Sequence, residues 1–240
     1  MIAAYIRLLY FFNDRLQLLK FIVNQANGRD YGIGWVQRWR LARRVIGNCQ
    51  KVSSLSTWQQ QLLMIAEILR TPKALPGDVV ECGCYNGASS VNLSLACGLI
   101  QRKLFICDSF EGLPEPGRDE QYDINADNQN YYVWEKGEFS APLELVKRNV
   151  EKYGDLSACV FVKGFFNESL ITIGTNHIIL VFEDADLASS VADCLKHLWP
   201  KLQDGGRFFS HEPWSMHVVS LFYDKKWWAE NFKTPSFFGP

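Results

Sequence analysis

The sequence predicts an α/β fold built on a mostly parallel sheet with helices on both faces. Short runs of β-branched and aromatic residues alternate with helical patterns from residue 77 to residue 232, and this alternation is typical of the class. The first run leads into a glycine-containing turn, and later runs stop at acidic residues or at histidine. Open α/β sheets bind ligands at the carboxyl ends of their strands, so these endings predict where a functional site lies.

The chain has 240 residues and 48% hydrophobic content, which predicts one sizeable core and one domain with additions. Its net charge is −1, so the overall balance does not favour a nucleic-acid partner. The charge is uneven, because residues 1–51 carry nine Lys and Arg against Asp14 and Asp30, a net charge of +7. Such a basic start forms either a solvated helix face, which we favour, or a contact with a membrane surface or an anionic partner.

Residues 1–23 are the segment closest to a targeting signal, but Arg7 and Asn13–Arg15 interrupt them and no small-residue cleavage site follows. Apolar positions at helical spacing predict a docking or homo-oligomerising helix first and a peripheral membrane helix second. These positions are Ile2, Ile6, Leu9, Phe12, Leu16 and Leu19. The seven cysteines are odd in number and lie mostly in apolar surroundings, which predicts reduced thiols in a cytoplasmic protein.

The chain divides into an N-terminal helical extension, residues 1–70, and a domain over residues 71–240. A helix over 56–72 closes the extension, with Ser56 as its cap and Pro72 at its end. The first strand is a β-branched run that ends at glycine, and the later strands are likewise short apolar runs. The predicted strands are 77–83, 103–110, 159–166, 177–186 and 205–212, and the predicted helices are 88–100, 140–154, 187–202 and 218–232.

Residues 111–140 are polar, contain proline and glycine, and show no periodicity. Loops of this length inside a compact domain are usually lids or binding loops, and we predict a lid. The helix over 140–154 follows, with Ser140 as its cap and Gly154 at its end.

The turn after the first strand reads G-x-x-x-G at Gly83 and Gly87, which differs from the G-x-G-x-x-G dinucleotide pattern. Glu81 stands just before this turn, which disfavours a pyrophosphate and suits a ligand with a positive centre. Asp108 ends the second strand, where an acidic side chain typically accepts ribose hydroxyls. Together these residues predict a nucleoside ligand without phosphates; the alternative is that Asp108 is a solvated strand end.

Three carboxylates in four residues end the fourth strand, and His211-Glu212 ends the fifth. Asp184 and Asp186 share a face if the strand continues. Desolvated carboxylates repel one another unless a cation joins them, and hard divalent cations take oxygen ligands. We therefore predict a divalent metal site at Asp184, His211 and Glu212. The alternative is that His211 caps the strand and Glu212 pairs with a basic side chain.

With these residues assembled, the chain resembles the macrocin O-methyltransferase family, class I S-adenosylmethionine-dependent enzymes that methylate sugar hydroxyls of macrolides. The similarity runs from about Leu75 to Phe209. It implies a Rossmann-like sheet and an acceptor that is a glycosylated natural product, a glycolipid or a polysaccharide. The matching motifs are GDVVECGCYNGASS (77–90), CDSFEGLPEP (107–116), VKGFFNESL (162–170) and EDADLASSVADCLKHLWPKLQDGG (183–206), of which the second is the most specific.

The resemblance also implies roles for individual residues. Asp108 would bind the ribose of the cofactor. Asp184 would be a magnesium ligand that orients the acceptor hydroxyl, lowers its pKa and takes its proton. The methionine part would lie among Glu81, Gly83, Asn86, Gly87 and Ser89, the adenosine near Ser109 and Phe110, and the adenine beside Gly164 and Phe165.

Two features depart from the family pattern. The family usually has two adjacent aspartates where this chain has His211-Glu212, so the site would hold one negative charge less and bind magnesium more weakly or favour softer metals. Class I methyltransferases normally end in an antiparallel strand pair, but only KTPSFFGP (233–240) follows the last predicted helix. This pair is therefore predicted to be reduced or missing.

Three functions remain open from the sequence. The first is metal-assisted O-methyl transfer with Asp184 and His211 at the catalytic centre. The second is metal-independent transfer with His211 as general base. The third is a non-catalytic module that binds a nucleoside, or a partner at a membrane surface, as the basic N-terminal region suggests.

Overall fold

The computed structural model describes residues 14–124 and 131–232, and a five-stranded sheet forms its centre. The strand order is β5-β2-β1-β6-β7, and every neighbouring pair is parallel. The prediction of a mostly parallel sheet is therefore confirmed. The strands are β1 (Asp78–Cys82), β2 (Leu104–Asp108), β5 (Cys159–Lys163), β6 (Ile178–Glu183) and β7 (Leu202–Ser210).

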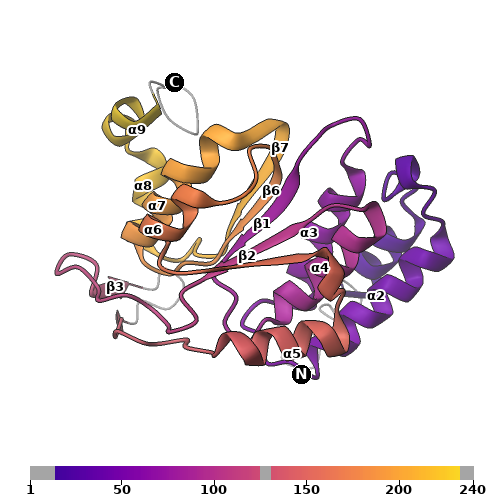
Figure 1. Ribbon diagram of the computed structural model, residues 1–240, viewed down its shortest axis with the longest axis horizontal. Coiled ribbons are helices and arrows are strands. Elements are labelled where there is room, and N and C mark those ends of the chain that lie inside the picture. The colour runs from indigo at the N-terminus through magenta and orange to yellow at the C-terminus, as the bar shows by residue number, and fades with distance from the viewer. Residues whose placement is uncertain (1–13, 125–130, 233–240) are drawn as a thin grey trace, which may run out of the picture.

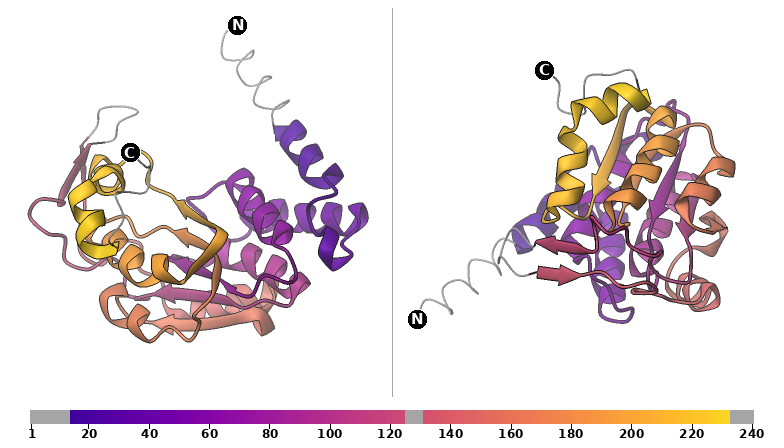
Figure 2. Two further views of the ribbon diagram at one scale, coloured as in Figure 1. Left: turned by 90° about the horizontal axis from the view of Figure 1, so that it is seen from above. Right: turned by 90° about the vertical axis from the view of Figure 1, so that its left-hand side faces the viewer.

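Helices cover both faces of this sheet (Figures 1 and 2). Successive side chains of a strand point to opposite faces, so Val79 and Ile106 pack in one core while Val80 and Cys107 pack in the other. The first core lies against α2 (Trp35–Cys49), α3 (Trp58–Arg70), α4 (Ala88–Ile100) and α5 (Leu143–Tyr153). The second lies against α7 (Ala188–Leu198), α8 (Met216–Tyr223) and α9 (Lys225–Phe232). Shorter elements are α6 (Phe166–Ser169), η1 (Arg29–Tyr31), η2 (Leu156–Ala158), η3 (Leu170–Thr172) and η4 (Trp199–Lys201).

The described part of the N-terminal extension is helical, as predicted. Residues 14–23 form a helix that precedes η1, α2 and α3. The buried Arg38 of α2 joins the end of this first helix to the segment before α2, because its guanidinium donates to the carbonyls of Ile22 at 2.7 Å and Ile33 at 2.7 Å. Leu16 and Leu19 stay exposed. The other predicted apolar positions, Ile2, Ile6, Leu9 and Phe12, lie outside the described residues.

Two predicted helix caps are wrong. Thr57 rather than Ser56 caps α3, since its Oγ1 accepts from the backbone N–H of Gln60 at 3.3 Å and the Gln60 side chain accepts from the Thr57 N–H at 2.7 Å. This reciprocal pair is a capping box, which Ser56 cannot form one residue earlier. Likewise, α5 begins at Leu143, directly after Pro142, and Ser140 lies outside it.

The segment over residues 111–140 contains a small hairpin that the sequence did not predict. β3 (Tyr122–Ile124) pairs antiparallel with β4 (Tyr131–Val133), and this pair projects from the sheet end where β3 is labelled in Figure 1. The hairpin is fixed to α8, because the buried Asp123 accepts a hydrogen bond of 2.5 Å from Ser215. The role of the segment as a lid stays a prediction.

The helix predicted over 218–232 is two helices, α8 and α9, that meet at Asp224. Asp224 leaves the helical conformation with φ −73° and ψ 90°, and its side chain accepts from the backbone N–H groups of Lys226 and Trp227, both at 3.0 Å. An aspartate in this position starts a new helix. No strand follows β7 within residues 211–232, and KTPSFFGP lies outside the described residues, so the reduced or missing strand pair stays a prediction.

All seven cysteines are free thiols, and five of them are buried. Among the described helices, none combines the length and the apolar character that a membrane span needs.

Candidate active site

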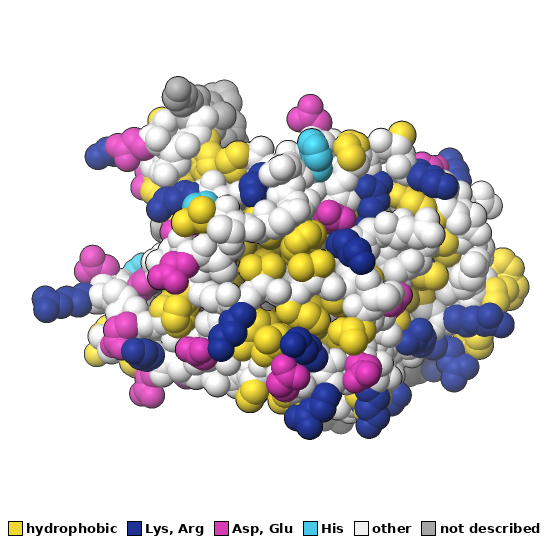
Figure 3. Space-filling view, in the orientation of Figure 1, with side chains coloured by type: hydrophobic (Ala, Val, Ile, Leu, Met, Phe, Trp, Pro, Cys, Tyr) yellow, Lys and Arg dark blue, Asp and Glu magenta, His cyan; other side chains and the backbone are white. Residues whose placement is uncertain are grey.

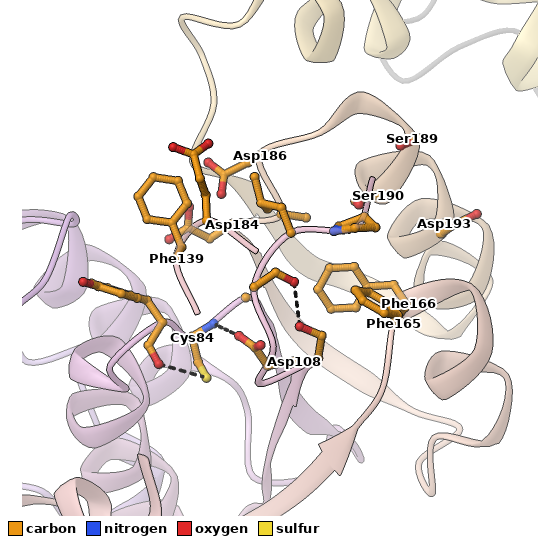
Figure 4. A pocket seen from close by; sticks show the side chains of 18 of the residues that line it. Cys84, Asp108, Phe139, Phe165, Phe166, Asp184, Asp186, Ser189, Ser190 and Asp193 are labelled. Carbon is orange, nitrogen blue, oxygen red and sulfur yellow. Dashed lines mark hydrogen bonds between the residues drawn. The ribbon is translucent and has the colours of Figure 1, made fainter. Parts of the chain in front are cut away.

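A cavity of about 300 Å³ opens at the carboxyl ends of the central strands. Figure 4 shows Asp108, Phe165 and Asp184 around it. Asp108 is the last residue of β2, and Phe165 and Asp184 follow β5 and β6. The parallel topology brings such strand ends to one edge of the sheet. Five predicted site residues line the cavity: Gly83, Asp108, Ser109, Phe165 and Asp184.

Asp108 is held in one orientation by backbone donors. Its Oδ2 accepts from the N–H of Cys84 at 2.8 Å, and its Oδ1 accepts from the N–H of Phe110 at 2.7 Å. A carboxylate has about four acceptor positions, so further positions remain for the hydroxyl groups of a ligand. Phe165 and Phe166 line the same part of the cavity and offer an apolar wall for a flat ring (Figure 4). This half of the cavity fits a nucleoside.

Gly83 and Gly87 both adopt left-handed backbone angles, with φ of 83° and 80°. A Cβ atom on Gly83 would collide with the carbonyl oxygen of Asp184, and one on Gly87 would lie 2.7 Å from Cγ1 of Val146. The turn therefore needs glycine because other parts of the chain approach it closely. The contact at Gly83 also fixes the backbone that carries Asp184 against the first turn.

Gly83→Ala is expected to lower the free energy of unfolding by about 2 kcal/mol more than Gly205→Ala, because the added methyl group is overpacked against a backbone oxygen. Gly205 is a matched control, since its φ is 80° and nothing lies within 4 Å of an added Cβ. Urea denaturation of both variants measures the difference. Equal losses would contradict a close approach between Gly83 and Asp184.

Glu81 lies behind the turn and does not line the cavity. It is fully buried, its Oε2 accepts from the hydroxyl of Ser90 at 2.5 Å, and its Oε1 has no partner among the described residues. Burial raises the pKa of Glu81 to about 8, although hydrogen bonds from Ser89 and Ser90 oppose the rise. Burial therefore favours the protonated form of the Glu81 carboxyl.

We expect Glu81→Gln to make the fall in stability with rising pH less steep, because it removes the share of Glu81 and leaves those of Glu183, Asp186 and Glu212. An unfolded glutamate loses its proton near pH 4.3, whereas the folded Glu81 keeps it up to a pKa of about 8. Between these values the Glu81 side chain binds one proton more in the folded state than in the unfolded state, so its share of the slope is about 1.4 kcal/mol per pH unit. Urea unfolding from pH 5 to 8 measures this slope. The exposed Glu151 is the control, and a Glu151→Gln variant should keep the wild-type slope.

Asp184, His211 and Glu212 meet where β6 and β7 end. Nδ1 of His211 lies 2.9 Å from Oδ1 of Asp184, and one ligand atom from each of the three residues lies within 4.8 Å of the others. Asp184 and His211 are partly exposed, whereas Glu212 is buried. The structure thus brings the three predicted metal ligands together.

Two further carboxylates surround this cluster. β6 ends at Glu183, so Asp184 and Asp186 do not share a strand face as expected. Asp186 has a left-handed φ of 62°, which turns the chain away from the strand direction. Glu183 accepts from the N–H of Ala185 at 2.9 Å, yet one carboxylate oxygen of Glu183 and one of Glu212 are buried without a partner among the described residues.

Burial, and after it the proximity of these acids to one another, raises their pKa values. Burial raises the pKa of Glu183 to about 7 and raises the pKa values of Asp186 and Glu212 above their usual range, and the neighbouring carboxylates add to each shift. The hydrogen bond to Asp184 raises the pKa of His211, while burial opposes it. Four carboxylates thus face a single imidazole. This excess of oxygen ligands and negative charge fits a divalent cation.

The remaining predicted residues flank the cavity. Ser89 lines a hollow of about 30 Å³ beside it, together with Cys84 and Asp184. His211 and Glu212 are not part of the cavity wall and reach it through Asp184. The predicted cofactor residues that also lie outside the wall are Asn86, Gly87, Phe110 and Gly164.

Several lining residues were missed from the sequence. Leu55 belongs to the N-terminal extension and borders both the cavity and the smaller hollow; it lies in an irregular segment between α2 and α3, where no periodic signal exists. Ser189, Ser190 and Asp193 come from α7. The sequence does contain a signal for these three residues, because they lie on the first turns of the helix that follows β6 and Asp184.

The sequence from residue 18 to residue 215 matches the model of a family described as macrocin O-methyltransferase (TylF). This range is wider than the resemblance over 75–209, because it includes most of the helical extension. The match therefore places Leu55 inside the family region.

Two curated relatives align over 136 residues. The 8-demethyl-8-(2,3-dimethoxy-α-L-rhamnosyl)-tetracenomycin-C 4′-O-methyltransferase of Streptomyces olivaceus is 36% identical to this chain. The demethyldecarbamoylnovobiocin O-methyltransferase of Streptomyces niveus is 29% identical. Each alignment covers 55% of this chain and 51% of the relative, so this chain spans about half the length of the curated relatives it matches.

Solved structures share the fold. The O-methyltransferase NovP superposes with a TM-score of 0.60 at 20% identity, covering 78% of this chain and 89% of NovP. The calicheamicin methyltransferase CalS11 superposes with a TM-score of 0.55 at 17% identity, covering 79% of this chain and 84% of CalS11. These likenesses confirm a Rossmann-like methyltransferase sheet with N-terminal helices.

Proposed function

This chain belongs to the macrocin O-methyltransferase family, and from that premise we propose that it is an S-adenosylmethionine-dependent O-methyltransferase acting on a sugar hydroxyl of a glycosylated small molecule. The observation that carries this proposal is one cavity whose wall holds both the oriented carboxylate of Asp108 and Asp184, which His211 contacts from outside the wall. Both curated relatives are named as O-methyltransferases, and one name includes a rhamnosyl group.

In this proposal Asp108 accepts hydrogen bonds from the two ribose hydroxyls of the cofactor, and Phe165 and Phe166 border its adenine. When bound, S-adenosylmethionine supplies a methyl group on a positively charged sulfur. The turn at Gly83 and Cys84 lies between Asp108 and Asp184 in the cavity wall, so it would border the reacting end. Positioning a hydroxyl in line with the methyl group supplies much of the rate.

Asp184 would act on the acceptor. A neutral alcohol is a poor nucleophile, so a base or a Lewis acid has to make alkoxide character accessible. Asp184 is partly exposed in the cavity wall, where its carboxylate can orient a sugar hydroxyl and accept its proton. The imidazole of His211, 2.9 Å away, would hold Asp184 in place.

We also propose that a divalent cation, magnesium in the first place, assists the reaction and is held by Asp184, His211 and Glu212. When bound, such a cation lowers the pKa of a hydroxyl group beside it. The unpartnered buried oxygens of Glu183 and Glu212 and the excess of carboxylates support it. Imidazole in place of a carboxylate would weaken magnesium binding and favour manganese or zinc.

A specific contact favours a second candidate, metal-independent transfer with His211 as general base. The 2.9 Å hydrogen bond between Asp184 and His211 is the arrangement by which a carboxylate orients a histidine base. Asp184 also raises the pKa of His211. This candidate predicts a rate that rises with pH through the His211 pKa, above its ordinary value of about 6.5.

The deciding experiment follows transfer of a labelled methyl group from S-adenosylmethionine to a tetracenomycin that carries an α-L-rhamnosyl group, with the compound that lacks the sugar as control. Loss of transfer in EDTA and recovery with magnesium or manganese support the metal. Transfer unchanged by EDTA, but lost in His211→Asn, supports the histidine base. Absence of S-adenosylmethionine binding by calorimetry would overturn both and leave a non-catalytic module.

We propose that residues 111–140 cover the acceptor, as a lid does. In the present structure Glu120 fastens this segment to the start of α7, because its carboxylate accepts from the hydroxyl of Ser189 at 2.7 Å and from its N–H at 2.9 Å. Glu120→Gln is expected to raise KM for the acceptor about threefold to tenfold with a smaller change in kcat, since a charge-assisted bond at a helix start is weakened. Steady-state kinetics measures this, and an unchanged KM would argue against a lid fastened at Ser189.

A further inference from the structure

A basic cleft lies at the opposite end of the sheet from the cavity. Its volume is about 530 Å³, and α2, the residues after it and the end of α5 form its walls. α5 ends shortly before β5 begins, so the cleft lies at the amino ends of the strands, whereas the cavity lies at their carboxyl ends. The lining residues are Trp39, Arg40, Arg43, Arg44, Gly47, Asn48, Lys51, Lys152 and Tyr153.

Five cations and no carboxylate line this cleft. Arg40, Arg43, Arg44, Lys51 and Lys152 are all exposed, and none of the five forms an ion pair within the ranges 14–124 and 131–232. Figure 3 shows Lys and Arg side chains gathered at the lower right, where α2 and the end of α5 lie. The concentration of positive charge is local, because the net charge of the chain is −1.

Internal contacts occupy these cations only in part. Arg44 donates to the carbonyl of Tyr153 at 3.0 Å, and the ammonium groups of Lys51 and Lys152 lie 5.3 Å and 5.1 Å from the ring centre of the same tyrosine. Arg43 lies 4.9 Å from the ring centre of Trp39. These contacts hold the cations around the cleft, while no carboxylate neutralises their charge. The cleft is therefore built to receive an anion.

Apolar and aromatic side chains continue the basic surface along α2. Trp35 is 65% exposed, Val36 37% and Trp39 41%, although large apolar side chains are normally buried. Trp35 and Trp39 stand four residues apart, so they share one side of the helix. Exposed tryptophans beside clustered Lys and Arg are typical of a surface that lies at a bilayer interface, with the rings among the headgroups and the cations on anionic lipids.

We propose that α2 and the basic cleft dock this protein on the surface of an anionic lipid bilayer. Arg40, Arg43 and the neighbouring cations contact lipid phosphates, and Trp35 and Trp39 enter the headgroup layer. Docking at the amino ends of the strands leaves the cavity at the carboxyl ends open to solvent. Membrane binding and methyl transfer to a dissolved acceptor are therefore separable.

The test is sedimentation of the full chain with vesicles of phosphatidylcholine alone or with one third phosphatidylglycerol. Binding is expected only to the anionic vesicles and is expected to weaken in high salt. Arg40→Glu/Arg43→Glu is expected to lower the partition coefficient at least tenfold, since each cation near an anionic surface contributes to binding. Trp35→Ala/Trp39→Ala should lower it while keeping the dependence on salt.

The matched control is Lys225→Glu/Lys226→Glu, which makes the same change of charge at two exposed positions on α9 and should keep wild-type binding. S-adenosylmethionine affinity should be unchanged in all variants, which separates this proposal from the proposed function. Vesicle binding that survives Arg40→Glu/Arg43→Glu would overturn the proposal. So would binding of inorganic phosphate or of RNA at the cleft with no partition onto anionic vesicles.

Discussion

Asp184→Asn is expected to lower kcat for methyl transfer about 10³-fold, the scale of losing a catalytic base. The substitution keeps the shape of the side chain and removes the charge that accepts a proton or holds a cation. Asp184 meets His211 at 2.9 Å and shares the cluster with Glu212, so both candidate mechanisms require its carboxylate. Single-turnover kinetics with saturating S-adenosylmethionine measures the chemical step directly.

The control for this variant is Asp204→Asn, which removes one charge at an exposed position of β7 and should keep wild-type kcat. The melting temperature of Asp184→Asn should not fall, because the variant removes the repulsion of Asp184 with Glu183, Asp186 and Glu212. Retention of more than a tenth of the wild-type kcat would show that Asp184 is not the group that acts on the acceptor hydroxyl.

The fold was predictable because its strongest local signals agree with its long-range topology. Four of the five strands are short and mostly apolar, and three of these, β2, β5 and β6, end at a charged residue. All six residues of β6 are buried, as a central parallel strand requires. The predictions that failed concern helix caps and helix ends, where neighbouring residues compete for the same role. Thr57 outcompetes Ser56 as a cap because Gln60 completes a capping box with it, and Asp224 interrupts a continuous helical pattern by capping α9.

The candidate site was predictable wherever it depends on strand ends. Asp108, Asp184 and His211 each end or follow a strand, and the order β5-β2-β1-β6-β7 places those ends side by side. The protonation state of the acidic groups around the site was not predictable from the sequence, because it depends on how deeply each group is packed. Glu81 looks like a charge for a cationic ligand, yet its burial behind Ser90 raises its pKa to about 8.

The glycines of the first turn show the same limit. The sequence assigns these glycines to the nucleoside site, whereas the neighbours of Gly83 and Gly87 in the structure are the backbone of Asp184 and the side chain of Val146. A single sequence does not show which segment approaches a glycine, because that depends on long-range packing. The consequence is functional all the same, since this contact sets the position of Asp184 relative to the turn.

Asp108→Asn is expected to raise the Kd for S-adenosylmethionine about 100-fold. Two backbone N–H groups, from Cys84 and Phe110, already point at the two carboxylate oxygens at 2.8 Å and 2.7 Å. An amide would set its NH₂ group against one of these donors, which leaves two donors facing each other. The ribose hydroxyls would also lose their bonds to a charged acceptor, each contributing about 1.5–3 kcal/mol, and about 2.7 kcal/mol corresponds to 100-fold.

Asp78→Asn is the matched control for this variant, because Asp78 makes the same kind of bridge at the other end of β1. Its Oδ1 accepts from the N–H of Lys103 at 2.9 Å and its Oδ2 from the hydroxyl of Thr175 at 3.1 Å. Asp78→Asn should therefore cost stability while leaving the Kd unchanged. Calorimetric titration of both variants with S-adenosylmethionine separates the two effects. A Kd that rises equally in both would mean that Asp108 serves the sheet and not the ribose.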